Sequence, residues 1–468
     1  MEIAKIPRPS HHEEEIAAYL CRWASDHDLY TEQDAIGNVI IDKPASPGYE
    51  AAPKVILQAH MDMVCVAAEG VAYDPLHDPI RVINDGSRLT ADGTSLGADD
   101  GIGVALCLYV LQDQALKHGP LRVLITVNEE DGMDSAAIAP KYLDASFLIN
   151  LDWEWLGSLC NSSAGCDFLT LTRPTAWEPI PPSDALIQVQ IKGLLGGHSG
   201  VDINRGRANA LVSLAAALYR LEGEGIPFHI VDFGGGQAKN AIPASAQAIV
   251  SVPEEHRQRA AACLEEEGQR FLEAFDAIEE GAVFSVAALT DRPRRHLEKS
   301  LGGDLLGLLL TLPNNVHTMS PFADGLVESS QNLGLLTVDD GQITLSAMER
   351  SCVRYRGEEI LRTSRLIARR FGFAYLQGEH APAWAVNPKS KLTPLACRVY
   401  QELTGNTMVV EQVHGGLECG AFSEKNPALD MIAIGPTLTD VHSPKEACDL
   451  ESVRITAELV VAVLEQLK

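Results

Sequence analysis

The stretch "LRVLITVNEEDGM", residues 121–133, joins a β-branched apolar run to two adjacent glutamates, Glu129 and Glu130. The apolar run predicts a buried strand, and the glutamates are expected at its carboxyl end. A Glu-Glu pair in this position is most often part of a solvated loop, because adjacent like charges repel each other. A second interpretation gives the two carboxylates different roles, and it requires partners from elsewhere in the chain.

Apolar runs on both sides of this stretch predict the architecture around it. "KVILQAH" predicts a short buried strand that ends at His60, and "SFLINLD" predicts another that ends at Asp152. Between them, "GADDGIGVALCLYVLQD" predicts a helix that begins near Asp100, for which an N-cap is the simpler role. Strands that alternate with helices favour a mostly parallel sheet with both faces covered. The predicted fold class is therefore α/β.

Two proline-bearing stretches divide the chain, "RPTAWEPIPPSDA" from Arg173 and "PAWAVNPKSKLTP" from Pro382. Proline disfavours helix interiors and central strands, so both stretches are expected to be domain linkers. We predict a first domain that is built from two segments, residues 1–184 and 388–468. Residues 185–387 are predicted to form an inserted domain.

The insert is predicted to have an α+β fold with two similar halves. Alternating runs such as "IQVQIKG" indicate half-exposed strands, and they are followed by long amphipathic helical patterns. The theme recurs near the end of the insert, with a hairpin that turns at residues 339–341 and then another helix. No repeat is visible at the level of single residues.

Bulk properties exclude several classes of function. The chain has 468 residues, which predicts two or three domains, and a formal net charge of −27. Such a charge argues against binding to nucleic acid or to an anionic membrane. No apolar run approaches the roughly 20 residues of a membrane span, and the N-terminus has no signal-peptide core, so a cytoplasmic location is expected.

Histidine and carboxylate side chains gather at the predicted strand ends. In an open α/β sheet, ligands bind outside the carboxyl ends of the strands. Imidazole and carboxylate without cysteine suit Zn²⁺, or Mn²⁺ or Co²⁺ as substitutes. Each motif alone is weak evidence, but together they predict a two-metal site with one bridging ligand. The residues at or just beyond such ends are His60, Asp62, Asp99, Glu129, Glu130 and Asp152, and His442 joins them from elsewhere in the chain.

These motifs resemble one family along most of the chain. From Ile6 to the C-terminus, their order and spacing are similar to those of the aminoacyl-histidine dipeptidases (peptidase D), within the wider family of co-catalytic zinc dipeptidases, aminoacylases and carboxypeptidases. The resemblance implies a zinc-peptidase catalytic domain with an inserted lid. The motifs are "IPRPSHHEEE", "QAHMDMV", "TSLGADDGIG", "NEEDGM", "INLD", "GGHSGVDINRGRANA", "NAIP", "HGGLECG" and "GPTLTDVHSP".

The resemblance implies a specific set of metal ligands. Asp99 would bridge two zinc ions. His60 and Asp152 would complete the site of one ion, and Glu130 and His442 would complete the site of the other. Mn²⁺ or Co²⁺ would be possible substitutes for zinc.

The resemblance also implies the catalytic roles. Glu129 would act as the general base on a water between the two ions, and Asp62 would orient the imidazole of His60. His198 would help to stabilise the developing oxyanion. Residues that would bind substrate are His198, Asn240 and Arg350. Ala244 stands where the family commonly has arginine, so a contact made by that arginine is missing or is supplied elsewhere.

The leading hypothesis is therefore a zinc dipeptidase acting on unblocked dipeptides, including Xaa-His types. One alternative is a related amidohydrolase acting on N-acyl amino acids or short peptides, because the metal chemistry is shared. An alternative of another class is an inactive binding or scaffold protein with the same fold. The expected partner is a small peptide substrate, and the chain is expected to be a monomer or a homodimer.

Overall fold

The computed structural model describes residues 1–132, 134–289, 295–321 and 325–468. The chain forms two compact units. Unit 1 comprises residues 1–163, 382–413 and 417–468, and unit 2 comprises residues 164–381 and 414–416.

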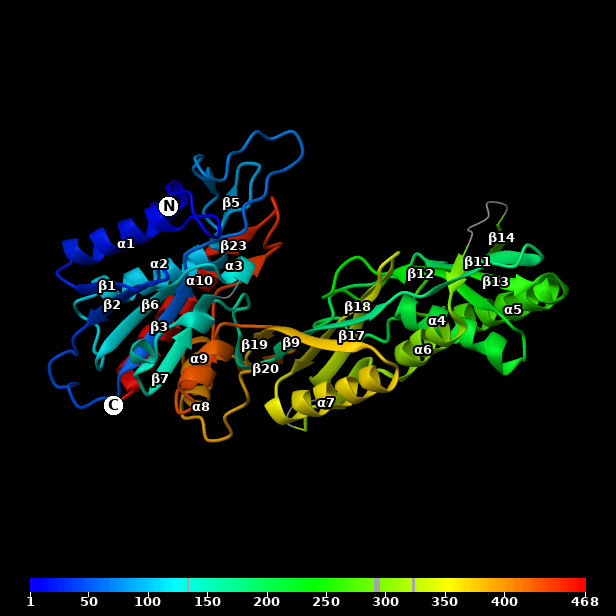
Figure 1. Ribbon diagram of the computed structural model, residues 1–468. Helices are drawn as coiled ribbons and strands as arrows, with labels where there is room; N and C mark the ends of the chain where they lie inside the picture. Colours follow the sequence, from blue (N-terminus) through cyan, green and yellow to red (C-terminus); the bar gives the residue numbers. More distant parts are fainter. Residues whose placement is uncertain (133, 290–294, 322–324) are drawn as a thin grey trace. The chain divides into compact units, whose positions relative to one another are not determined.

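Unit 1 is built on an eight-stranded sheet with a parallel centre (Figure 1). Strand β3 pairs in parallel with both β6 and β7, and β7 pairs in parallel with β21. The predicted mostly parallel α/β sheet is thus confirmed. In spatial order the strands are β1 (Tyr30–Gln33), β2 (Val39–Lys43), β6 (Leu121–Thr126), β3 (Val55–His60), β7 (Phe147–Asn150), β21 (Asp430–Ala433), β8 (Ser158–Ser163) and β20 (Val409–Val413).

Helices cover both faces of this sheet, because successive side chains of a strand point to opposite sides. Leu57 of β3 packs in the apolar cluster formed with α1 (Glu14–Asp26), α2 (Ala98–Gln112), α8 (Leu392–Thr404) and α10 (Leu450–Gln466). Its neighbour Ile56 belongs to the cluster on the other face, with η3 (Pro140–Leu143) and α9 (Cys419–Lys425). Three further short helices in unit 1 are η1 (Ile3–Lys5), α3 (Glu129–Gly132) and η2 (Asp134–Ala137).

A small four-stranded sheet joins distant parts of unit 1. Its order is β22 (Leu438–Thr439), β23 (Ala447–Asp449), β5 (Arg88–Ala91) and β4 (Val82–Asn84). Because β23 pairs with β5, the loop between β22 and β23 lies beside the segment that leads into α2. This arrangement brings the C-terminal part of the chain to the N-terminal end of a core helix.

Unit 2 is built on a nine-stranded sheet whose recorded pairs are all antiparallel. The order is β14 (Val283–Ala288), β11 (Asp184–Lys192), β13 (Ala246–Pro253), β12 (His229–Gly235), β17 (Val327–Val338), β18 (Gln342–Ser351), β9 (Gly165–Pro174) and β19 (Ala374–Ala381), with β16 (Asn315–Met319) also paired to β17. Beside it, β10 (Trp177–Pro179) pairs with β15 (Arg295–Leu297). The helices are α4 (Ala210–Gly223), η4 (Glu254–His256), α5 (Arg257–Phe275), α6 (Lys299–Thr311) and α7 (Arg354–Arg370).

The strand order of unit 2 shows the two similar halves that the sequence predicts. One half reads β14-β11-β13-β12 and the other reads β19-β9-β18-β17, and they meet where β12 pairs with β17. In chain order, each half also has a helix directly before its last strand: α5 precedes β14 and α7 precedes β19. The halves are therefore related by topology although no residue repeat relates them.

The chain enters unit 2 earlier than the proline-rich stretch that we expected to mark the boundary. Unit 2 begins at Ala164 rather than at residue 185, because β9 pairs along its length with β18 and also with β19. The chain returns to unit 1 at Pro382 rather than at residue 388. The prolines from Pro174 to Pro182 thus lie inside the second unit, around the two-stranded sheet of β10 and β15.

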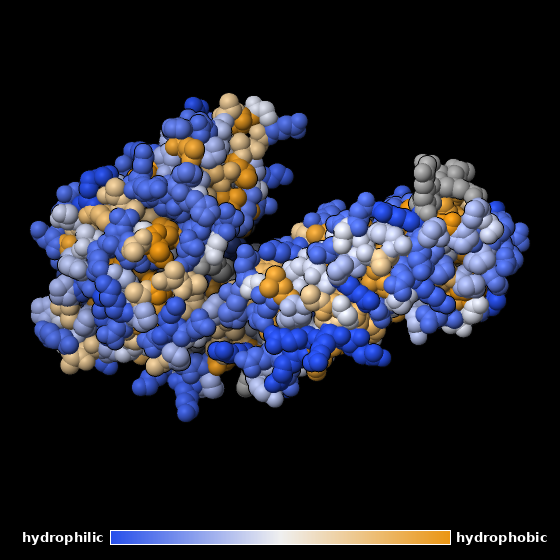
Figure 2. Space-filling view, in the orientation of Figure 1, coloured by the Kyte–Doolittle hydropathy of each residue, from blue (hydrophilic) through white to orange (hydrophobic). Residues whose placement is uncertain are grey.

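Helix α7 gives unit 2 a basic face on a strongly acidic protein. Its arginines are exposed, while Ile360, Leu361 and Ala368 are buried against the sheet. The hydrophilic surface over this helix is visible in Figure 2. Across the described parts of the chain, no helix has both the length and the apolar character needed to cross a membrane.

Candidate metal centre

The carboxyl ends of three neighbouring parallel strands in unit 1 form the base of the candidate site. Strands β6, β3 and β7 are adjacent and parallel, so their carboxyl ends meet at one edge of the sheet. His60 is the last residue of β3, and Asp152 follows the end of β7 by two residues. The sheet thereby brings together side chains that are about 90 residues apart in the sequence.

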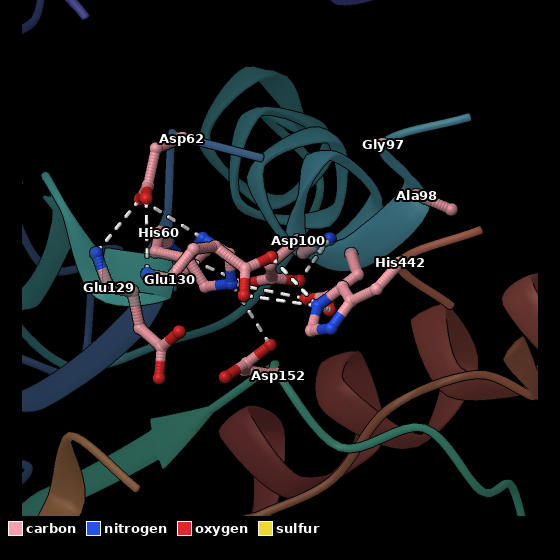
Figure 3. A network of polar contacts seen from close by, with 12 residues as sticks. His60, Asp62, Gly97, Ala98, Asp100, Glu129, Glu130, Asp152 and His442 are labelled. Atoms are coloured by element: carbon pink, nitrogen blue, oxygen red, sulfur yellow. Dashed lines mark hydrogen bonds and ion pairs between the residues drawn. The ribbon is translucent and has the colours of Figure 1, made fainter. Parts of the chain in front are cut away.

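The two glutamates of the opening stretch lie beyond β6, and here the prediction of a strand that runs to Glu130 is wrong. Strand β6 ends at Thr126, and Glu129 and Glu130 begin the short helix α3. Asn128 has a positive φ of 54°, so the backbone turns sharply between the strand and the helix. The neighbouring glutamates leave a helical turn in different directions instead of alternating across a sheet (Figure 3).

One group of three side chains surrounds the buried imidazole of His60. Its Nε2 lies 3.1 Å from Oδ1 of Asp99 and 3.3 Å from Oδ1 of Asp152. Burial alone would lower the pKa of His60, but the carboxylates of Asp152, Asp62 and Asp99 raise it well above its usual value. This pocket therefore favours a positive charge on the imidazole or beside it.

A second group shares Asp99 with the first. Nε2 of His442 lies 3.0 Å from Oδ2 of Asp99 and 3.0 Å from Oε2 of Glu130. Hydrogen bonds to these two carboxylates raise the pKa of His442 to about 10. Asp99 thus presents one oxygen to each group, which is the arrangement of a bridging ligand (Figure 3 shows His60, Glu130, Asp152 and His442 converging).

The side chains fit a pair of divalent cations. In each group, the candidate ligand atoms of the three residues lie within 4.8 Å of one another. The donors are imidazole nitrogens and carboxylate oxygens, which suit zinc and similar ions. Three carboxylates converge on two histidines, and both histidines have raised pKa values. Bound cations would supply the positive charge that protons on these histidines otherwise provide.

Asp62 connects a candidate ligand to the glutamate pair. Its Oδ1 lies 3.3 Å from Nδ1 of His60, on the side of the ring away from Asp99. Its carboxylate also accepts the backbone N–H of Glu129 and that of Glu130, each at 3.1 Å, and the hydroxyl of Ser10 at 2.7 Å. Although burial opposes ionisation, the imidazole of His60, the hydroxyl of Ser10 and the N–H of Glu129 lower the pKa of Asp62 to about 2. Asp62 is therefore an ionised anchor for both elements.

Glu129 belongs to neither three-residue group. Its backbone is held by Asp62, and its side chain extends away from that anchor (Figure 3). Without cations, burial raises the pKa of Glu129 to about 8, and the carboxylates of Glu418, Glu130 and Asp99 add to the effect. A nearby positive charge would lower this pKa again, so Glu129 is placed to exchange a proton near neutral pH.

Asp100 has the structural role that the sequence suggested. Its Oδ1 accepts the N–H of Gly103 at 3.0 Å, as an N-cap does. Its Oδ2 accepts the backbone N–H of His60 at 3.2 Å, which ties the start of α2 to the end of β3.

The remaining predicted residues, His198, Asn240 and Arg350, lie in unit 2. Nη2 of Arg350 lies 3.2 Å from Nε2 of His198, and the N–H of Ser199 donates to the carbonyl of Asn240 at 2.9 Å. Burial and the positive charge of Arg350 lower the pKa of His198, so this imidazole is neutral at pH 7. The structure therefore brings His198 and Arg350 together within unit 2.

Three charged residues near the centre were not assigned from the sequence. Arg8, Glu418 and Glu446 are each at most 2% exposed. Glu418 accepts hydrogen bonds from Gln58 at 2.6 Å and from Thr126 at 2.8 Å. Two of the three lie inside motifs quoted for the resemblance, "IPRPS" and "HGGLECG", and the third follows His442 by four residues. Burial of a charged side chain is the signal, and it becomes visible only in the folded chain.

Comparison with known proteins identifies the class to which this fold and site belong. The model of Peptidase family M20/M25/M40 matches residues 56–466, and the chain belongs to this family. The chain is 33% identical over 467 residues to the "Cytosol non-specific dipeptidase" of Escherichia coli (strain K12), covering 100% of this chain and 96% of the relative. The resemblance found in the sequence is confirmed.

Solved structures agree with this assignment. The aminoacylhistidine dipeptidase from Vibrio alginolyticus superposes with a TM-score of 0.93 at 33% identity, covering 100% of this chain and 95% of that chain. The aminopeptidase PepT from Bacillus cereus superposes with a TM-score of 0.56 at 17% identity, covering 100% and 96%, and shows the common fold alone. The protein is thus a metallopeptidase of this family.

Proposed function

We propose that the protein hydrolyses dipeptides in a reaction that depends on two divalent cations. The observation that carries this proposal is the position of Asp99, whose two oxygens face His60 and His442 respectively. Two ions held by one shared carboxylate can act on the same substrate carbonyl and water. The dipeptidases among the relatives, from Escherichia coli and Vibrio alginolyticus, support the choice of substrate.

The cations would be held by the two groups that share Asp99. His60 and Asp152 would complete one site, and Glu130 and His442 would complete the other. Bound there, divalent cations would polarise the scissile carbonyl and increase the acidity of the attacking water. Zinc is favoured because its usual protein ligands without cysteine are imidazole and carboxylate, with Mn²⁺ or Co²⁺ as substitutes.

Glu129 would move the protons of the reaction. It would take a proton from the attacking water and deliver it to the departing amine as the peptide bond breaks. Asp62 would keep Glu129 in place through the backbone and would keep His60 in one orientation through its Nδ1. The adjacent glutamates would therefore differ in role because Glu130 binds a cation and Glu129 does not.

The predicted roles of unit 2 belong to the same proposal. Unit 1 would be the catalytic domain, and unit 2 would be the lid that supplies groups for the substrate. A buried arginine such as Arg350 suits a substrate carboxylate, and neutral His198 can donate to an oxyanion. Asn240 would contact the substrate as well. The name of the Escherichia coli relative supports a cytoplasmic location.

A panel of substrates and a metal analysis test the proposal together. The purified protein should contain close to two divalent ions per chain, and removal of these ions by a chelator should abolish dipeptide cleavage until Zn²⁺, Mn²⁺ or Co²⁺ is added. The panel should compare Xaa-His dipeptides, other dipeptides, tripeptides and N-acyl amino acids. Cleavage of N-acyl amino acids in preference to free dipeptides would contradict the proposed substrate. If the protein as purified contains no metal ions and has no hydrolytic activity, the alternative of a binding protein would be favoured.

A further inference from the structure

The segment that presents Asp99 has backbone N–H groups that its own helix does not satisfy. Asp99 and Asp100 have non-helical backbone angles, with ψ of 113° and 35°, and Gly97 has a positive φ of 65°. The regular hydrogen bonding of α2 therefore begins only after these residues, and the N–H groups before it need other acceptors. The segment is buried, so leaving them without acceptors would be costly.

One side chain, Glu446, accepts four consecutive N–H groups of this segment. Its Oε2 accepts from Leu96 at 2.7 Å and from Gly97 at 2.9 Å, and its Oε1 accepts from Ala98 at 2.7 Å and from Asp99 at 3.2 Å. Glu446 is 2% exposed and lies about 350 residues further along the chain. Four charge-assisted hydrogen bonds from consecutive residues fix the path of the backbone.

Arg8 binds the carbonyl side of the same segment. Its Nη2 donates to the carbonyl of Gly97 at 2.5 Å, and its Nη1 donates to the carbonyls of Met61 and Asp62 at 2.9 and 2.8 Å. Arg8 is also 2% exposed, and its charge interacts with that of Glu446. Gly97 is thus held between a buried anion on its N–H and a buried cation on its carbonyl.

The guanidinium fits here because position 97 has no side chain. A Cβ at Gly97 would lie 2.6 Å from Nη2 of Arg8 and 2.5 Å from Sδ of Met63. Through Met61 and Asp62, Arg8 also connects the Asp99 segment to the residues that follow His60. Arg8 therefore ties together the two backbone segments that carry His60 and Asp99, two candidate ligands of the same ion.

The loop that carries Glu446 also carries a candidate ligand. His442 lies four residues before Glu446, in the loop between β22 and β23, and its Nε2 lies 3.0 Å from Oδ2 of Asp99. The loop consequently contacts the backbone of Asp99 through Glu446 and the side chain of Asp99 through His442. A shift of this loop would move both at once.

We propose that Glu446 and Arg8 form a buried clamp that positions Asp99 between the two cation sites. Neither residue belongs to either candidate ligand group, and both act through the backbone around Asp99, so they are positioning residues rather than catalytic residues. The proposal rests on the proposed function, because it requires Asp99 to be a shared ligand. It assigns to Glu446 the control of cation affinity at both sites.

The test replaces Glu446 by glutamine in the full chain and measures binding of Co²⁺ to the metal-free protein. A glutamine NH₂ group would face two backbone N–H donors that the carboxylate now accepts. The affinity for both ions should fall by roughly 10- to 100-fold, the usual effect of losing a residue that supports a ligand. The Co²⁺ absorption spectrum should change, and with excess metal the KM for a dipeptide should stay unchanged. Glu451→Gln is the matched control, since Glu451 is exposed and pairs with Arg454.

The outcomes separate this inference from the proposed function. If wild-type protein does not bind two ions, the proposed function fails. If wild-type binds two ions and a folded Glu446→Gln variant binds them with the same affinity and spectrum, the clamp is overturned while the proposed function stands. If Glu446→Gln does not fold, Arg8→Lys decides with the same measurements, because lysine keeps the charge but lacks the fork that spans three carbonyls. Unchanged Co²⁺ binding in Arg8→Lys would then overturn the clamp.

Discussion

The carboxylate of Asp62 lies 3.3 Å from Nδ1 of His60, so the face of the imidazole that does not meet Asp99 is occupied by an anion. The same carboxylate accepts the backbone N–H groups of Glu129 and Glu130. One buried aspartate therefore orients a candidate ligand and the turn that carries the proposed base. Loss of its charge should affect metal binding and turnover together.

Asp62→Asn should weaken metal affinity by roughly 10- to 100-fold and should also lower kcat. The amide keeps the size of the side chain, but its NH₂ group cannot accept the N–H groups that Asp62 now accepts. Isothermal titration of the metal-free protein and steady-state kinetics with a dipeptide would measure both effects. Asp74→Asn is a matched control, because Asp74 forms an exposed pair with His77. Equal effects of the two substitutions would argue against an anchoring role for Asp62.

Glu129→Gln should keep both ions and lose turnover. Glutamine cannot take a proton from water, so kcat should fall by on the order of 10²- to 10⁴-fold while the metal content stays at two. Asp131→Asn is the control, since Asp131 lies on the same short helix but is exposed beside His11. A Glu129→Gln variant with normal turnover would remove Glu129 from the mechanism.

His442→Ala should reduce the bound metal from two ions to one. His60, Asp99 and Asp152 remain as a complete group, whereas the other group keeps only Glu130 and the shared Asp99. Metal analysis after dialysis would give the stoichiometry, and hydrolysis should fall to near background. His77→Ala, which removes an exposed histidine, should change neither. Loss of both ions would indicate that the two sites form only together.

Glu349→Gln should change how stability depends on pH. Burial raises the pKa of Glu349 from 4.5 to about 8, aided by Asp167 and opposed by Arg350. The unfolded chain therefore loses this proton first, and the contribution of Glu349 to stability falls as the pH rises from about 4.5 to about 8. The variant lacks this penalty. Its free energy of unfolding should therefore rise relative to that of wild-type across this pH range by a few kcal/mol, on the order of 1.4 kcal/mol per pKa unit.

Urea unfolding at pH 5.5 and pH 8.5 would measure this difference. The advantage of Glu349→Gln over wild-type should be larger at pH 8.5. Glu379→Gln, at an exposed position in unit 2, should show no such trend. An advantage that is independent of pH would mean that Glu349 is ionised throughout this range in the folded protein.

The sequence predicted the parallel sheet and the cluster of candidate ligands because both follow from local patterns. The apolar run before His60 and the one before Asp152 each specify a buried strand, and parallel neighbours must end at the same edge. The fine geometry of the glutamate pair was not predictable in the same way. At the sharp turn, the N–H of Asn128 donates to Glu13, which is 115 residues away, and its side chain donates to Asp134. Neither contact leaves a periodic pattern in the sequence.

Buried charges and domain boundaries could not be predicted from the sequence for a related reason. Glu446 and Arg8 look like ordinary polar residues of loops, since their partners are backbone groups that any residue type could provide. The boundary at Ala164 was missed because a strand with alternating polarity, β9, pairs with two strands, β18 and β19, that lie more than 150 residues further on. Prolines mark irregular backbone, but they do not reveal which sheet the preceding strand joins.

The paired halves of unit 2 have a consequence for how this chain can change over generations. In an assembly of two identical chains, a single substitution appears twice, once on each side of the symmetry axis. Here β14-β11-β13-β12 and β19-β9-β18-β17 are encoded separately, so a substitution alters one half and leaves its counterpart intact. Each half can thus differ from its counterpart in surface chemistry, and α7 carries six arginines where α5 carries three.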